Sequence, residues 1–423
     1  MATSSNNIPT RPRADVMGLL DLPAEVTELI ARSCDPHDLL ALRLVNHDIS
    51  SKIIRTFTAN FFKQRMLLLC DEKQLRTLIN IANHPHFGRA VQVLVCCIDE
   101  LPQPDDFLRT DRLEESPPPA PEDLSLDQFL ELKDKEREYH TLLEEQNSFQ
   151  ETQTDLHLLT VIFSRLRRQG GIPQLGVVDR YSAYWNGPYD SHPNIPTPRL
   201  EALTGELLAP PVDYSRAVEI VVEAASLSLL KIDAFTICYD NWYWSMTYLV
   251  SDKMIDHSKQ MFFSLKHLQL MFAPDEDADT VTVHKMLELF AVAQSLETLS
   301  LQAHEPERNS PDVSLLWALT SMIMTQGFPM LRQLWLSGFV LEFAKVTSFI
   351  ECHDKLKHLH LRHCHFPSVH ANRSFWLHHE HPDCVEKHNK AVHELIRDRT
   401  GFSMTRLEGC TVREWEPDEE KWT

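Results

Sequence analysis

Glycine is scarce in this sequence, at only 11 of 423 residues. Neither G-x-G-x-x-G nor G-x-x-x-x-G-K occurs, so the chain has no glycine-rich loop to cradle a nucleotide phosphate. This disfavours a doubly wound nucleotide-binding fold. No run approaches the roughly 18 consecutive apolar residues of a membrane-spanning helix, and segment 1–14 lacks the apolar core of a signal peptide. We therefore expect a protein of the cytoplasm, the nucleus or both, without membrane binding.

The nine cysteines include no C-x-x-C pair. Disulfide frameworks and structural zinc sites depend on regular cysteine spacing, so neither is indicated. We expect reduced, mostly buried thiols, no metal site and no cofactor.

Clustered positive charge is also missing, and the formal net charge is -20, from 41 Lys and Arg against 61 Asp and Glu. Segment 99–155 alone holds 18 acidic and 5 basic residues, which gives -13. Nucleic acids and anionic membranes require clustered Lys and Arg, so neither is an expected partner. Basic or neutral proteins fit this charge better.

Near its start, the sequence contains short segments with apolar residues at helical spacing. Val26, Leu29 and Ile30 form one segment, and Leu39, Leu40 and Leu42 with Val45 form the next. Asp35, Pro36 and Asp38 stand at the N-cap, first and third positions of a predicted helix. Residues 45–57 predict a third helix. Helices this short need a partner surface to be stable.

This run, with Leu19-x-x-Leu22-Pro23 before it, resembles an F-box, the helical domain that binds the adaptor subunit of a cullin-RING ubiquitin ligase. The resemblance implies a three-helix domain at 19–60. It also implies adaptor contacts by the residues Leu19, Leu22, Pro23, Val26, Leu29, Ile30, Pro36, Leu39, Leu40 and Val45. A plain helical cap on a larger domain is the alternative. Cys34 and Asn46-His47 depart from the usual pattern.

A second pattern, Leu-x-x-Leu-x-Leu followed by a small or Cys residue, recurs along the rest of the chain and predicts short strands with alternating inward side chains. The clearest copy is Leu356, Leu359, Leu361, Cys364 and Phe366. Other copies begin at Leu331, Leu296, Leu265 and Leu227, and weaker ones include Val91, Ile172 and Phe402. Helical patterns separate them. This resembles the irregular leucine-rich repeats of fungal F-box proteins, although any α/β domain with Leu-rich parallel strands is an alternative.

The predicted fold is therefore α/β: a three-helix F-box followed by an irregular leucine-rich-repeat solenoid of parallel strands alternating with helices. The expected divisions are a disordered tail at 1–18, the F-box at 19–60, connecting helices and a first repeat at 61–99, an acidic Pro-rich loop at 100–123 and a repeat-like substrate-binding domain at 124–423. One long helix is expected from Leu124 to about Arg168.

Aromatic residues gather in two irregular regions that follow, and loop aromatics suit binding hot spots. They give a candidate substrate-binding set of Tyr184, Trp185, Tyr189, Trp242 and Trp244. An equally open interpretation is that these rings pack long loops against the repeats.

Histidines crowd the C-terminal part, with His358 and His360 at outward positions of one predicted strand. Their spacing matches no structural zinc pattern, so surface histidines on a repeat face are the preferred interpretation, and a pH-sensitive binding face is a second one. Cys364 lies between His363 and His365, but its repeat position predicts an inward side chain.

There is no G-x-S-x-G elbow, and we expect a protein that is not an enzyme.

The predicted function is substrate recognition in an SCF-type ubiquitin ligase, with the adaptor, the cullin bound through it, and an unknown protein substrate as partners. A leucine-rich-repeat scaffold outside any ligase is the main alternative. A metal-dependent enzyme that uses the His-rich C-terminal part is the other.

Overall fold

The computed structural model describes residues 18–98, 100–101, 126–178, 215–238, 249–272, 280–303, 319–321, 323–362, 364–367, 394, 397, 406–408 and 411–413. The chain forms two compact units, Met1–Lys63 and Gln64–Thr423, called unit 1 and unit 2 below. Among the described residues, no helix combines the length and apolar character needed to cross a lipid bilayer.

Unit 1 is a cluster of short helices, whose bounds are η1 (Leu19–Asp21), α1 (Ala24–Ser33), α2 (Pro36–Val45), α3 (His47–Lys52) and α4 (Ile54–Phe61). The predicted start of α2 is confirmed, because the Asp35 side chain accepts a hydrogen bond from the Asp38 N–H at 2.8 Å and Pro36 is the first helical residue. The single third helix expected at 45–57 is wrong. Asn46 ends α2 and caps α3 through the Asp48 N–H, and a turn at Ile53 separates α3 from α4.

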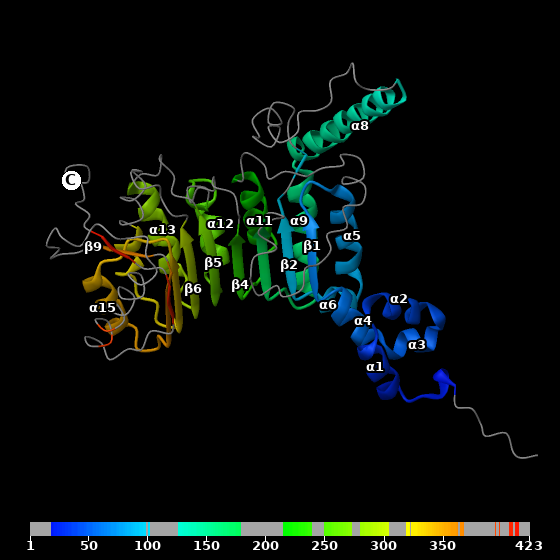
Figure 1. The fold of residues 1–423 in the computed structure, drawn as a ribbon, viewed down its shortest axis with the longest axis horizontal. Coiled ribbons are helices and arrows are strands. Elements are labelled where there is room, and N and C mark those ends of the chain that lie inside the picture. The colour runs from blue at the N-terminus through cyan, green and yellow to red at the C-terminus, as the bar shows by residue number, and fades with distance from the viewer. Residues whose placement is uncertain are drawn as a thin grey trace, which may run out of the picture. The chain divides into compact units, whose positions relative to one another are not determined.

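Unit 2 is built on a parallel sheet whose strands follow one another in chain order (Figure 1). The sheet order is β1-β2-β3-β4-β5-β6-β7-β8-β10, without the reversal of a doubly wound sheet. The strands are β1 (Gln64–Leu68), β2 (Val93–Cys97), β3 (Gln174–Val178), β4 (Ala234–Cys238), β5 (His267–Phe272), β6 (Thr298–Ala303), β7 (Gln333–Ser337), β8 (His358–Arg362) and β10 (Arg406–Glu408). A separate parallel pair joins β9 (His365–Pro367) and β11 (Thr411–Arg413).

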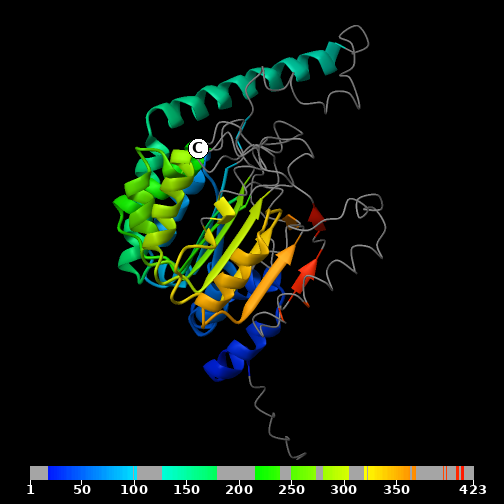
Figure 2. The same ribbon diagram turned by 90° about the vertical axis from the view of Figure 1, so that its left-hand side faces the viewer.

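Helices connect many of these strands and lie on one face of the sheet (Figure 2). Their bounds are α5 (Glu72–Asn83), α6 (Phe87–Ala90), α9 (Thr154–Arg168), α11 (Ser215–Leu227), α12 (Ile255–Phe262), α13 (Thr280–Val292) and α15 (Phe343–Cys352). The coarse prediction of an α/β chain with parallel strands alternating with helices is confirmed.

The sheet side of the core beneath these helices consists of two columns of buried side chains. Each strand from β2 to β8 contributes one residue to each column. In register, the first column from β2 to β8 is Leu94, Leu175, Phe235, Leu268, Leu299, Leu334 and Leu359. The second column is Cys96, Val177, Ile237, Leu270, Leu301, Leu336 and Leu361. All lie in one hydrophobic core, as expected from the two-residue period of a strand.

Two details of the repeat prediction are corrected by the register. In β4 the column residues are Phe235 and Ile237, so the repeat that seemed to begin at Leu227 is displaced, because Leu227 ends α11. The strand β1 was not predicted at all. Its only sequence signal is the short apolar run from Met66 to Leu69.

A long helix, α8 (Leu126–Glu151), contributes to a second hydrophobic cluster, which lies on the opposite face of the first four strands. Leu142 and Leu143 pack against Leu68, Val95 and other side chains of this face. The N-terminal half of α8 extends away from this contact (Figures 1 and 2). The single helix expected from Leu124 to Arg168 is wrong, because Gln153 adopts a left-handed conformation (φ 53°, ψ 28°) that separates α8 from α9.

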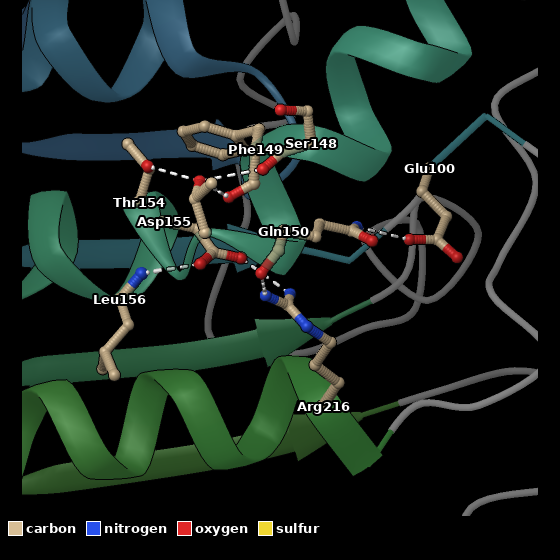
Figure 3. Close-up of polar contacts among 9 residues, drawn as sticks. Glu100, Ser148, Phe149, Gln150, Thr154, Asp155, Leu156 and Arg216 are labelled. Carbon is tan, nitrogen blue, oxygen red and sulfur yellow. Dashed lines mark hydrogen bonds and ion pairs between the residues drawn. The ribbon is translucent and has the colours of Figure 1, made fainter.

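A set of polar contacts fixes this break between the helices (Figure 3). The Asp155 carboxylate, on α9, pairs with the Arg216 guanidinium of α11 at 2.6 Å. The same guanidinium donates to the Gln150 carbonyl of α8 at 2.7 Å. The Gln150 side chain in turn donates to Glu100, just after β2, at 2.8 Å. Arg216 thereby holds α8 and α9 in one arrangement.

Candidate protein-docking surface

Helix α1 of unit 1 buries its small side chains and exposes its large apolar ones. Thr27 and Ala31 are fully buried, whereas Val26, Leu29 and Ile30 are exposed. An amphipathic helix that belongs only to its own domain places its large aliphatic side chains in the core. The orientation of α1 therefore indicates a surface prepared for contact with another molecule.

Helix α2 and the residues of η1 continue this exposed apolar set. Leu44 is 86% exposed and Val45 is 67% exposed, whereas Leu39 is fully buried. Eight of the thirteen exposed large hydrophobic side chains in the described residues lie between positions 19 and 45. These eight are called the apolar surface below: Leu19, Leu20, Val26, Leu29, Ile30, Leu40, Leu44 and Val45.

Contacts within unit 1 fix the segments that carry the apolar surface. The Lys52 ammonium on α3 donates to the carbonyls of Leu20 at 2.9 Å and Leu22 at 2.7 Å, which fixes η1 and the entry to α1. The Arg43 guanidinium of α2 lies 4.1 Å from the centre of the Phe57 ring on α4. The exposed side chains therefore project from a preorganised backbone, which lowers the entropic cost of binding.

Most of the residues predicted to contact an adaptor are accessible in unit 1. Leu19, Pro23, Val26, Leu29, Ile30, Pro36, Leu40 and Val45 are exposed, and Leu22 is half-buried. Leu39 is the exception. Its side chain is 0% exposed and belongs to the core of unit 1, so it supports the surface from beneath and cannot touch a partner directly.

Sequence reasoning missed two members of the apolar surface, Leu20 and Leu44. Leu44 lies one turn after Leu40 on α2, so the spacing of four residues is the signal that could have found it. Leu20 had no periodic signal, because η1 is a single short turn.

The candidate substrate-binding residues Tyr184, Trp185, Tyr189, Trp242 and Trp244 all lie outside the described residues. The same holds for the histidines of the C-terminal part from His370 to His393. In the part of the chain that the structure describes, no three His, Cys, Asp or Glu side chains converge closely enough to hold a metal ion.

Cys364 has the inward orientation predicted from its repeat position. The thiol is fully buried, and its sulfur lies 3.5 Å from the carbonyl oxygens of Leu336 and Arg362. The thiol thus lies against backbone carbonyl groups at the ends of β7 and β8.

Comparisons with known proteins add little to this picture. No family model matches the chain, and no curated protein matches it. One solved structure that matches is the apo form of the 3-keto-D-glucoside 4-epimerase YcjR from E. coli, at 9% identity over 62% of this chain and 90% of that chain. The TM-score is 0.20, and a likeness this weak carries no argument about fold or chemistry.

The expectation that the chain is not an enzyme is corrected, because the sequence offered no positive observation for it. That expectation depended on the absence of linear catalytic motifs. In folds with parallel strands, catalytic side chains come from the ends of several different strands, and such a site leaves no contiguous motif in the sequence. Missing motifs therefore do not exclude catalysis in this chain.

Proposed function

We propose that this chain is the substrate-recognition subunit of an SCF-type cullin-RING ubiquitin ligase, with unit 1 as the F-box that binds the adaptor. The observation that carries the proposal is the inverted burial of α1, which exposes Val26, Leu29 and Ile30 while Thr27 and Ala31 fill the core. An adaptor that buries these side chains gains roughly 1.5–3 kcal/mol for each aliphatic group that becomes fully covered.

Unit 2 is proposed to be an irregular leucine-rich-repeat domain that holds the protein substrate. Support comes from the sequential order of its parallel strands and from the two Leu-rich columns of its core. The inward Cys364 after β8 fits the same repeat pattern. In such an assembly, the substrate lysine is held near the ubiquitin-charged enzyme, and the high effective concentration accelerates transfer.

Co-purification with the adaptor and cullin tests this proposal directly. The variant Leu29→Asp/Leu44→Asp places two charges in the apolar surface, and both positions are exposed, so unit 1 is expected to remain folded. Adaptor affinity should fall at least about tenfold, as for hot-spot residues at the centre of an interface. Phe263→Asp is the matched control, because Phe263 is 70% exposed on unit 2 and lies outside the apolar surface.

The proposal requires that the wild type and Phe263→Asp retain both adaptor and cullin. Adaptor binding without cullin would instead favour a scaffold outside the ligase. If the folded wild type binds neither protein, the F-box assignment is wrong.

A further inference from the structure

The sheet face opposite the packed helices changes character between β4 and β5. On β1 to β4 this face is largely apolar, and Met66, Val95 and Cys238 lie in one hydrophobic cluster with Leu142 and Leu143 of α8. On β5 to β8 the outward positions of the register are largely polar: His267, Gln269 and Met271; Thr298, Ser300 and Gln302; Gln333, Trp335 and Ser337; His358, His360 and Arg362. These positions are called the polar sheet face below.

No Asp or Glu occupies the polar sheet face, although acidic residues outnumber basic ones by 61 to 41 in the chain. The basic side chain there is Arg362, and the imidazole rings are those of His267, His358 and His360. On the helices of the other face, carboxylates are frequent, among them Glu219 and Glu288. On the neighbouring strand β10, Arg406 lies in register with His360 of β8, and Glu408 lies in register with Arg362 of β8.

The aromatic rings at the β7 and β8 end of this face are ordered by mutual stacking. Trp335 stacks on His360 with 4.9 Å between ring centres and an angle of 20° between the planes. His358 and His360 are also stacked, with centres 6.4 Å apart. His267 and His358 are exposed, and Gln269, Gln333, Trp335 and Arg362 are half-buried. These rings therefore hold fixed positions, so little ordering of their side chains is required on binding.

We propose that the polar sheet face of β5 to β8 binds an acidic, carboxylate-rich peptide segment of the substrate protein. Its imidazole, guanidinium, indole and amide N–H groups suit carboxylate oxygens, and the lack of carboxylates at the outward positions of β5 to β8 limits repulsion of an anionic chain. This inference deepens the proposed function, on which it rests for calling the bound protein a substrate. Peptide binding itself does not depend on the adaptor.

The test is a fluorescence-anisotropy titration of the full chain without adaptor. The probes are a fluorescein-labelled Glu-Ser repeat peptide and a Gln-Ser repeat peptide of equal length. The Glu-Ser peptide should bind at least about fivefold more tightly, and this preference should shrink as salt rises, because screening weakens exposed charge pairs.

The variant His358→Gln/Arg362→Gln should lose the preference for the Glu-Ser peptide. His284→Gln is the matched control, since His284 is exposed on α13 and belongs to the helical face. Leu29→Asp/Leu44→Asp should bind the peptide like the wild type, which separates this inference from the adaptor proposal. Equal binding of both peptides, or a face variant that behaves like His284→Gln while circular dichroism shows it folded, would overturn the inference.

Discussion

The carboxylate of Asp155 lies 2.6 Å from the guanidinium of Arg216, and the two residues are 61 positions apart in the sequence. The Asp155 side chain is only 3% exposed, and its other oxygen accepts the Leu156 N–H at 2.8 Å. The pair is therefore a fixed structural contact between α9 and α11, on which the position of α8 also depends through Gln150.

Replacing Arg216 by Met should destabilise unit 2 by about 3 kcal/mol, because the buried Asp155 carboxylate loses its charged partner. Chemical denaturation with urea measures the change. Lys253→Met is the control: Lys253 pairs with Glu219 at 3.2 Å but is 61% exposed, so its loss should cost less than about 1 kcal/mol. Similar costs for the two variants would contradict the structural role of the buried pair.

Leu39→Ala should destabilise unit 1 by about 2–5 kcal/mol, because it leaves a cavity in a small core. Leu44→Ala, five residues later on the same helix, should change the stability by less than about 0.5 kcal/mol, since that side chain is exposed. Hydrogen exchange of unit 1 amides reports both changes. Equal destabilisation by the two substitutions would show that Leu44 packs inside the unit and not on the apolar surface.

Burial raises the pKa of the Cys96 thiol from its ordinary value of 9.0 to about 12. Between these values the unfolded chain releases this proton while the folded chain keeps it, so the contribution of Cys96 to stability falls as the pH rises from about 9 to 12. Cys96→Ala should flatten the alkaline fall in the melting temperature. An unchanged pH profile in this variant would contradict the expected linkage.

The same burial predicts selective thiol chemistry in the native protein. Cys352 is exposed and should react readily with iodoacetamide at neutral pH, whereas Cys96 should react only after unfolding. Peptide mass spectrometry of pulse-labelled protein separates the two sites. Rapid native labelling of Cys96 would show that the core around β2 opens readily in the folded protein.

Gly338→Ala should destabilise unit 2 by about 1–3 kcal/mol, because Gly338 has a left-handed backbone conformation and an added methyl group would clash with a neighbouring strand. Gly338 has a φ of 79°, and an added Cβ would lie 2.2 Å from the Ala303 carbonyl oxygen on the neighbouring strand. Gly327→Ala is the control, because an added Cβ there meets no atom within 4 Å. Thermal melting should therefore show a large loss for the first variant and little loss for the second.

The sequence predicted those features that depend on local chemistry. Asp35 and Pro36 determine the start of α2, because a capping carboxylate and a preset φ suit the first turn of a helix. Leu299 and Leu301 predicted an inward face of β6, since side chains two residues apart in a strand point the same way. The break at Gln153 escaped prediction, because no Gly or Pro marks it.

Tertiary packing alone decided the features on which the functional proposals depend. The spacing of Val26, Leu29 and Ile30 is equally consistent with a core face, and only the fold shows that Ala31 and Thr27 occupy the interior in their place. Likewise, His360 and Trp335 come from separate strands, and their stacking depends on the parallel register of β7 and β8. Helical and strand periods determine which side chains share a face, but whether that face meets the core, a partner or solvent is determined by the other elements packed around it.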